Sequence, residues 1–221
     1  MTYKLMGANV SPFVRKVRVM LAEKGIAYDF EPVSPFAPPP NWREISPLGK
    51  IPALKDGEKV VNDSSVICQY IERKNKATPM LPADDDGYIQ ALWLEEYIDG
   101  GFTAVAGGKV FFPLVVAPLT TKAPPDAAAR AAAAKTVAEE LPTFWAYMEA
   151  QLGGNQFFVN NSLSLADIAI ASIHVNLLHC HVTVDGGRFP KLAAFMERMF
   201  ARPSFKALLE EEAPMWTMKN A

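Results

Sequence analysis

Apolar and polar residues alternate in short blocks along the first 76 residues of the chain. Residues 3–6 form a short apolar run, residues 12–24 carry apolar side chains at helical spacing, and residues 28–33 are rich in strand formers. A strand, a helix and a second strand in this order predict a βαβ unit. Residues 35–40 follow, and their prolines lack amide donors and fix φ, so this segment is predicted to be a surface loop.

A second group of elements follows the proline-rich loop. Residues 51–55 and 58–61 lie on either side of Asp56-Gly57, a dipeptide that tolerates the positive φ angles of a tight turn. They predict an antiparallel hairpin. Residues 64–75 then repeat apolar side chains at the i, i+3, i+4 spacing of a helix face. The expected order of elements is β-α-β, loop, β-β-α.

The pattern changes after residue 77. Residues 78–87 are rich in proline and aspartate, as is typical of a solvated connector between domains. Beyond them, apolar residues recur at helical spacing between glycine and proline breaks. Helices are predicted over residues 88–116, 126–152, 164–178, 189–201 and 204–211, and Pro142 is predicted to kink the second of them. The predicted fold class is α/β plus all-α, with a βαβ-ββα domain over 1–77, a linker over 78–87 and an all-helical domain over 88–221.

The helix predicted from residue 164 begins with a capping box. Ser164 stands at the N-cap and Asp167 three positions later, so each side chain can satisfy the backbone amide of the other. Losing such a box costs about 0.5–2 kcal/mol of stability. We interpret this pair as a folding device without a catalytic role.

The composition excludes several classes of partner. The 221 residues are 50% hydrophobic and 21% charged, with 22 basic residues against 24 acidic ones and a formal charge of −2. This is the composition of an ordinary globular chain. Since there is no long basic run, neither nucleic acid nor a membrane surface is an expected partner. Charge or proline interrupts each apolar run before the roughly 20 residues that a membrane-spanning helix needs.

The N-terminus, the cysteines and the histidines bear on compartment and metal content. The chain reaches Lys4 before any long apolar core and has no small-residue cleavage site, so a cytoplasmic location is expected. Cys68 and Cys180 lack a partner pattern, which favours reduced thiols over a disulfide or a zinc site. His179 and His181 are two positions apart and point to different sides of a helix, so no metal site is expected.

Ser11-Pro12 stands at the junction of the first predicted strand and helix. A serine before a proline in the first turn is a good N-cap, and capping alone is the simpler interpretation. The functional interpretation is that the Ser11 hydroxyl, beside backbone amides at the positive end of a helix dipole, donates a hydrogen bond to an anion.

Two further segments carry candidate binding chemistry. Pro52, between a loop and an apolar strand, is a candidate cis proline that would turn the backbone of Ile51 toward an extended peptide-like ligand. The alternative is a trans proline at the start of an edge strand. Asp63 and Ser64 follow the hairpin, where they can cap a helix or hold the charged groups of an amino-acid moiety.

Together, in this order and spacing, these segments resemble the glutathione transferase family. The run from Ser11 to Arg18 is similar to the serine-type active-site segment of the tau class and of related bacterial enzymes. The run from Ser46 to Pro52 is similar to the family's loop with its cis proline, and Asp63-Ser64 stands where the family has a glutamate-serine or glutamine-serine pair. The capping box at Ser164 and the segment from Phe189 to Pro203 also match, so the resemblance covers nearly the whole chain.

The resemblance implies a thioredoxin-like domain that binds glutathione and a helical domain that supplies the cavity for an electrophile. It implies that Ser11 stabilises the glutathione thiolate and that Ile51 pairs with the cysteinyl part next to Pro52. It also implies that Asp63 and Ser64 hold the γ-glutamyl end and Lys50 the glycine carboxylate. Glutathione is then a co-substrate, and no metal or redox cofactor is required.

Some assignments stay open at this point. Met6-Gly7 occupies the place of the tyrosine in tyrosine-type members, and neither cysteine lies near this turn, so a serine-type site is preferred. Asn9 could share or replace the role of Ser11. The electrophile pocket is placed at Phe13, the Phe36 loop, Val105, Lys109, Phe112 and Trp216, although ordinary packing is an equal alternative for each of them.

The family resemblance also implies a homodimer. Residues 91–99 on the first long helix are candidates for its interface, and Asp99 could reach the partner's glutathione. The predicted function is conjugation of the glutathione thiolate to a hydrophobic electrophile. The alternatives are a glutathione-dependent isomerase or dehalogenase on the same fold, and a non-catalytic protein-interaction module, because a fold does not fix a function.

Overall fold

The computed structural model describes residues 2–214, and contacts between Cα atoms divide the chain into two compact units. Among the described residues, the first unit comprises 2–81 together with 203–214, and the second comprises Pro82–Arg202. This division differs from the domain boundaries predicted above, because the last helix joins the first unit. The physical reason is a set of ion pairs between α1 (Pro12–Glu23) and α11 (Pro203–Glu212), described below.

The first unit is built on a four-stranded sheet of order β2-β1-β3-β4. Strands β1 (Tyr3–Gly7) and β2 (Tyr28–Pro32) are parallel, and β3 (Ala53–Asp56) is antiparallel to both β1 and β4 (Lys59–Asn62). The predicted βαβ and ββα units are thus confirmed. The Asp56-Gly57 turn is confirmed as well, with Gly57 at a φ of 60°.

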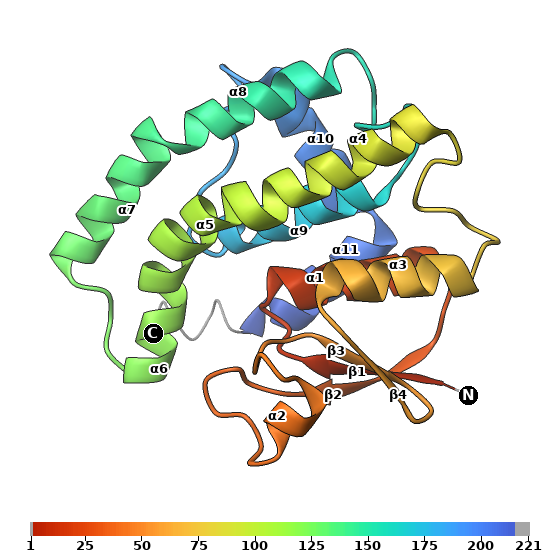
Figure 1. Cartoon of the computed structure of the whole chain (residues 1–221). Coiled ribbons are helices and arrows are strands. Elements are labelled where there is room, and N and C mark those ends of the chain that lie inside the picture. The colour runs from red at the N-terminus through yellow and green to blue at the C-terminus, as the bar shows by residue number, and fades with distance from the viewer. Residues whose placement is uncertain (1, 215–221) are drawn as a thin grey trace. The chain divides into compact units, whose positions relative to one another are not determined.

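Helices cover both faces of this sheet. Helices α1 and α3 (Ser64–Lys74) lie side by side over one face, and the short α2 (Trp42–Ile45) lies on the other (Figure 1). Most apolar residues of α1, from Val14 to Leu21, are fully buried, as expected for an amphipathic helix on a sheet. The proline-rich segment is a loop as predicted, but the sequence did not predict α2, whose single turn is too short to show periodicity.

The second unit is all-helical. Its first part is a continuous helical rod over Asp85–Thr121, in which α4 (Asp85–Glu96), α5 (Thr103–Val105) and α6 (Ala117–Thr121) alternate with the π-helical segments η1 (Tyr97–Phe102) and η2 (Ala106–Val116). The rod begins inside the predicted linker, because Asp84 caps it by accepting a hydrogen bond from Gly87 N at 2.8 Å. Pro113 lies within η2 and has no amide to donate, which is compatible with the wider hydrogen-bond ladder there.

Four more helices complete the second unit: α7 (Ala127–Glu139), α8 (Leu141–Leu152), α9 (Leu165–Leu178) and α10 (Pro190–Ala201). The sequence predicted one helix over residues 126–152 with a kink at Pro142. The structure breaks it at Glu140, because Pro142 occupies the first turn of α8, where a missing amide costs no intrahelical hydrogen bond. Helix α9 is buried along almost its whole length and packs against α4, η2 and α10 (Figure 1).

The predicted capping box at the start of α9 is confirmed. Asp167 accepts hydrogen bonds from Ser164 N at 2.8 Å, from Ser164 Oγ at 2.7 Å and from Phe158 N at 2.9 Å. Burial nevertheless raises the pKa of the Asp167 carboxyl to about 6, although these hydrogen bonds act in the opposite direction. The pair therefore fixes both the helix start and the loop before it.

The length of the rod differs from the sequence-based expectation that no apolar run is long enough to span a membrane. Its 37 residues include a window of mean hydropathy 1.6, so by length and composition alone this helix could cross a membrane. The sequence expectation considered uninterrupted runs, whereas the structure joins several apolar runs into one helix. A core helix of a soluble protein meets the same two criteria, so one such helix is weak evidence for a span.

Candidate functional site

Ser11 is the N-cap of α1, as the sequence predicted. Its Oγ accepts a hydrogen bond from Val14 N at 3.4 Å, and its own amide closes a turn onto Ala8 O at 3.0 Å. The bond from Val14 uses an acceptor lone pair, and a hydroxyl also carries one hydrogen to donate. The partly buried Ser11 side chain can therefore cap the helix and donate to an anion beside the helix N-terminus.

The predicted cis proline is confirmed, because the Ile51–Pro52 bond is cis. The loop before it is held by Ser46 Oγ, which donates to Lys50 O at 2.8 Å. The ladder between β3 and β1 begins at Ala53, so Ile51 lies outside the sheet register. Its side chain packs against a buried cluster that contains Trp42, while Lys50 is exposed to solvent.

Asp63 and Ser64 begin α3. Asp63 Oδ1 accepts from Ser65 N at 2.9 Å and from Val66 N at 3.2 Å, which confirms the predicted cap. Asp63 has a φ of 72°, a left-handed conformation that is uncommon for a residue with a Cβ. Such outliers cluster at ligand-binding sites, where the surrounding structure holds them in place. Ser64 is buried beside this turn.

The strand register brings these three segments to one edge of the sheet. Met6 pairs with Ala53, and Ala53 pairs with Asn62. Ser11 follows the end of β1, Ile51-Pro52 precedes the start of β3, and Asp63 follows the end of β4. Because β3 runs antiparallel to both neighbours, all three chain ends meet at the same edge. A helix N-cap hydroxyl, a cis-proline loop and a capped carboxylate are therefore neighbours.

Asn9, the alternative to Ser11, is already engaged. Its Oδ1 accepts from Arg18 Nη1 at 3.1 Å, and its Nδ2 donates to Glu211 Oε1 at 2.6 Å. The sequence analysis missed this network. The spacing of Arg15 and Arg18 on one face of α1 and the adjacent acids Glu211 and Glu212 were visible, but the sequence does not indicate that α11 meets α1.

Comparison with known proteins supplies the family. Residues 5–79 match the family model of the glutathione S-transferase N-terminal domain, and residues 115–212 match that of the C-terminal domain. Glutathione S-transferase 3 of Zea mays is 31% identical over 210 residues, which cover 92% of this chain and 91% of that protein.

The chain belongs to the glutathione S-transferase family. Its four-stranded sheet with helices is the thioredoxin-like domain of that family, followed by the helical domain, so the predicted fold class is confirmed. A solved glutathione S-transferase from Methylobacterium radiotolerans, in complex with glutathione sulfonate, is 28% identical with a TM-score of 0.72 and covers 94% of each chain. A stringent starvation protein A homolog of Pasteurella multocida is 28% identical over 91% of this chain and 87% of that protein.

The residues predicted to line the electrophile pocket of this transferase-family chain divide between the two units. Phe13 is partly buried in the first unit, whereas Val105, Lys109 and Phe112 belong to the rod of the second unit. Trp216 lies outside the described residues. Lys109 Nζ lies 2.7 Å from Glu140 Oε2, and this ammonium group holds the pKa of the Glu140 carboxyl below its usual range.

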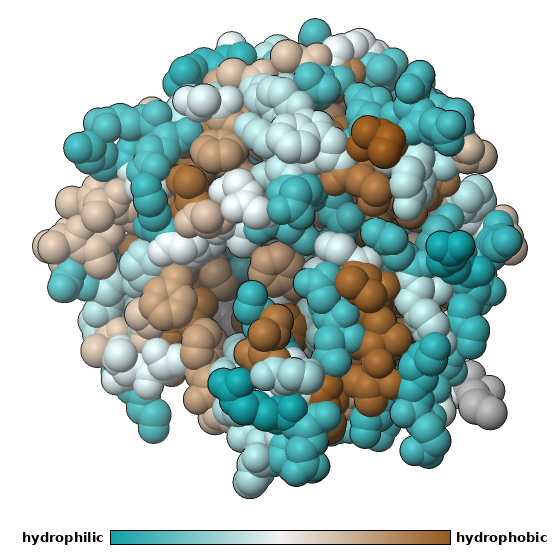
Figure 2. Space-filling model, in the orientation of Figure 1, coloured by the Kyte–Doolittle hydropathy of each residue, from teal (hydrophilic) through white to brown (hydrophobic). Residues whose placement is uncertain are grey.

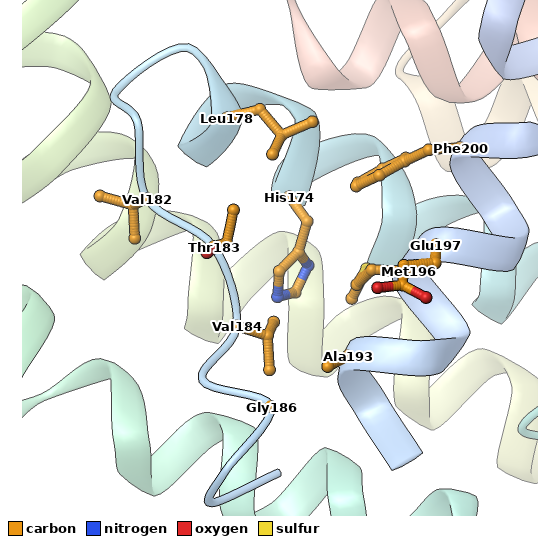
Figure 3. Close-up of a pocket in the computed structure, with 10 residues that line it drawn as sticks. All are labelled: His174, Leu178, Val182, Thr183, Val184, Gly186, Ala193, Met196, Glu197 and Phe200. Atoms are coloured by element: carbon orange, nitrogen blue, oxygen red, sulfur yellow. The ribbon is translucent and has the colours of Figure 1, made fainter. Parts of the chain in front are cut away.

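The helical unit also contains a separate cavity of about 380 Å³ between α9, α10 and the loop that joins them (Figure 3). Leu178, Val184, Met196 and Phe200 make its walls largely apolar, and Glu197 and His174 are among its polar lining residues. None of the predicted site residues lines it. Within residues 2–214, no group of three or more His, Cys, Asp or Glu side chains is arranged to hold a metal ion.

The buried His174 is neutral near pH 7, and we predict that the stability of the fold falls when this side chain is protonated at acidic pH. Its Nδ1 lies 2.7 Å from Ile170 O, its Nε2 lies 3.1 Å from Trp145 Nε1, and burial lowers its pKa to about 4. Because the folded pKa lies below the unfolded value, the stability from neutral His174 is complete above about pH 6.5 and is lost as the pH falls toward 4. The expected loss is about 3 kcal/mol.

Urea unfolding of the wild type and of His174→Gln between pH 4 and pH 7, followed by tryptophan fluorescence, measures this contribution. We expect the acid-induced fall in the free energy of unfolding to be smaller in His174→Gln. The matched control is His181→Gln at an exposed position, which should keep the wild-type profile. Parallel profiles for wild type and His174→Gln would show that another group causes the acid loss.

Proposed function

We propose that this protein conjugates the thiolate of reduced glutathione to a hydrophobic electrophile, with Ser11 stabilising the thiolate. The observation that carries the proposal is the meeting of three segments at one sheet edge: the Ser11 N-cap, the cis Ile51–Pro52 bond and the left-handed Asp63 cap. Family membership supports glutathione as the ligand, and a relative 28% identical to this chain has been solved with glutathione sulfonate.

The proposed chemistry follows from the pKa of the glutathione thiol. A free thiol has a pKa of about 8.5, and the thiolate is the nucleophile, so an enzyme working near neutral pH gains by favouring the anion. Lowering that pKa by two units corresponds to about 2.7 kcal/mol of preferential thiolate binding. One charge-assisted hydrogen bond from Ser11 together with a helix N-terminus can supply this amount.

Each remaining part of glutathione has a proposed partner in the first unit. The backbone of Ile51 pairs with the cysteinyl residue, as an extended peptide pairs with an exposed strand edge. Asp63 receives the γ-glutamyl ammonium, while Ser64 and the amides at the start of α3 receive its carboxylate. The exposed Lys50 binds the glycine carboxylate. Since the glutathione sulfur supplies the nucleophile, the reaction needs neither a metal nor a redox cofactor.

Phe13 in the first unit, and Val105, Lys109 and Phe112 in the rod of the second unit, remain the residues proposed to contact the electrophile. Phe112 is 47% exposed within the described structure, so part of its apolar surface can contact a substrate. Lys109 is tied to Glu140 and would line this site as half of an ion pair. We also propose a cytoplasmic role in detoxification, which would follow from conjugation of glutathione to an apolar electrophile.

We propose a homodimer that uses the α4 face. Ile89 and Trp93 on α4 are 63% and 52% exposed, and apolar patches interrupt the polar surface in the space-filling view (Figure 2). Large exposed apolar side chains on one helix are typical of an interaction surface. Asp99 lies one turn beyond this face, in η1, where it remains a candidate to approach the glutathione of the partner subunit.

A second candidate function is a non-catalytic interaction module. The observation that favours it is the similarity to the stringent starvation protein A homolog, which covers most of both chains. An isomerase or a dehalogenase would use the same glutathione-binding residues. Analysis of the products formed from each class of substrate distinguishes these reactions from conjugation.

Titration of reduced glutathione into the wild-type protein by calorimetry, with a chloronitrobenzene conjugation assay on the same sample, tests the proposal. We expect saturable binding at one site per chain and conjugation above the uncatalysed rate. Binding without turnover of any electrophile would favour the interaction module. A folded protein that binds no glutathione would contradict both the conjugating enzyme and its isomerase and dehalogenase alternatives.

A further inference from the structure

Two consecutive glutamates of α11 bind two arginines of α1 within the first unit. Arg15 Nε and Nη2 lie 3.0 and 2.7 Å from the two carboxylate oxygens of Glu212, and both side chains are buried. Arg18 Nη2 lies 2.6 Å from Glu211 Oε2. Because residues three apart on a helix share a face, the guanidinium groups of Arg15 and Arg18 both point toward the same neighbouring helix. These ion pairs hold α11 against α1.

Glu211, Arg18 and Asn9 form a closed triangle of hydrogen bonds. Arg18 donates to Glu211 and, through Nη1 at 3.1 Å, to Asn9 Oδ1, while Asn9 Nδ2 donates to Glu211 Oε1 at 2.6 Å. The Arg18 guanidinium donates to the amide oxygen of Asn9, and the Glu211 carboxylate accepts from the amide nitrogen of Asn9. Each polarity is therefore matched, and the orientation of the Asn9 side chain is fixed.

The arginine in this triangle is itself immobilised from the other side. Arg18 Nε donates to Tyr28 Oη at 2.8 Å, and the guanidinium lies 4.6 Å from the centre of the Phe30 ring. Both aromatic residues belong to β2. Such stacking and forked hydrogen bonding hold an arginine in one rotamer, which a lysine cannot reproduce. The triangle thus connects β2, α1 and α11.

Asn9 lies in the turn between β1 and α1, two residues before Ser11. The turn is closed by the hydrogen bond from Ser11 N to Ala8 O, and the strand before it is held by the bond from Val33 N to Gly7 O. Because the Asn9 side chain is held in the triangle, the backbone from residue 9 to Ser11 is also restricted. Catalytic groups must be held within a fraction of an ångström of their working position.

We propose that Glu211 is a positioning residue that acts through Arg18 and Asn9 to hold the Ser11 hydroxyl in place for the glutathione thiolate. The inference rests on the proposed role of Ser11. It assigns α11 a part in the glutathione site, and it gives Asn9 a structural role in the turn before Ser11, since its oxygen and one of its two amide hydrogens are committed to the triangle.

Hydrogen–deuterium exchange on the glutathione-free protein tests the positioning part by itself. Glu211→Gln removes the negative charge at nearly constant side-chain size. Arg18→Lys keeps the positive charge but loses the planar guanidinium that donates several hydrogen bonds. We expect both variants to exchange the amides of residues 8–11, 13 and 14 about tenfold faster than the wild type. The matched control is Glu210→Gln, an exposed acid on the same helix, which should exchange like the wild type. Unchanged exchange in both test variants would overturn the proposal.

The consequence for catalysis is read from the thiolate absorbance of bound glutathione as a function of pH and from steady-state kinetics. We expect Glu211→Gln to raise the pKa of the bound thiol and to lower kcat about tenfold, with little change in the KM for glutathione. A purely structural role would lower the melting temperature and leave the thiol pKa and kcat unmoved, and that result would also overturn the proposal. Absence of glutathione binding in the wild type would instead contradict the proposed function, while the exchange experiment would still decide whether Glu211 holds the turn.

Discussion

Replacing Ser11 by alanine is expected to lower kcat/KM for conjugation about 100-fold at neutral pH, because the bound thiol loses its hydrogen-bond donor and its pKa returns toward that of a free thiol. Glutathione binding should change little, since the proposed contacts of Ile51, Asp63 and Ser64 stay in place. The measurements are steady-state kinetics and calorimetric titration on the same preparations. A rate ratio that shrinks as the pH rises above the free thiol pKa would identify thiolate formation as the step affected.

The cap formed by Ser11 makes a stability control necessary. Removing an N-cap serine costs about 1 kcal/mol, so the melting temperature of Ser11→Ala has to be recorded beside its activity. Ser11→Thr keeps a hydroxyl and should retain much of the rate. Ser34→Ala removes the hydroxyl of an exposed serine in the same unit and should behave as the wild type. Equal activity of Ser11→Ala and Ser34→Ala would exclude Ser11 as the thiolate stabiliser.

The largest expected effect on stability comes from the buried ion pair between Arg15 and Glu212. Glu212→Ala should lower the free energy of unfolding by about 3–5 kcal/mol, because it leaves a buried guanidinium without its carboxylate. Arg15 and Glu212 side chains are 0% and 1% exposed, so water cannot replace the lost partner. Denaturant unfolding followed by circular dichroism measures the change.

Glu210→Ala on the same helix is the matched control. Glu210 is exposed and lies 4.0 Å from Lys206, a surface pair of the kind that contributes little to stability. We expect its effect to stay below about 1 kcal/mol. Equal losses for the two variants would mean that the buried pair contributes no more to stability than the exposed Lys206–Glu210 pair, which would contradict the prediction. The double variant Arg15→Met with Glu212→Leu should recover part of the stability, since it removes both buried charges.

The local features of the site could be predicted from the sequence because each depends on residues close together along the chain. The Ser11 cap needs only the three residues that follow it, the turn at Gly57 needs only a residue free to adopt positive φ, and the capping box of Ser164 and Asp167 spans four residues. The cis bond at Pro52 was predicted from a proline between a loop and an apolar strand.

The same kind of reasoning failed where competing local signals were present. For residues 126–152 the sequence predicted one helix kinked at Pro142, and the structure goes further by ending α7 at Glu139 and beginning α8 at Leu141. The rod was predicted as an ordinary helix, whereas its central part is π-helical around Pro113. The left-handed conformation of Asp63 was also missed, because an aspartate in a cap signals no particular φ.

The sequence by itself determined the order of the elements apart from α2 and the division between α7 and α8, the change of composition after residue 77 and the chemistry available at the start of α1, because periodicity, capping and turn preferences are local. Only the tertiary structure decided that α11 joins the first unit, that Asn9 is held by Arg18 and Glu211, and that Ser11, Ile51 and Asp63 share one sheet edge. These pairings join residues as many as 202 positions apart. Charge and hydropathy give no signal for such a partner until the strand register and helix packing bring it within hydrogen-bond distance.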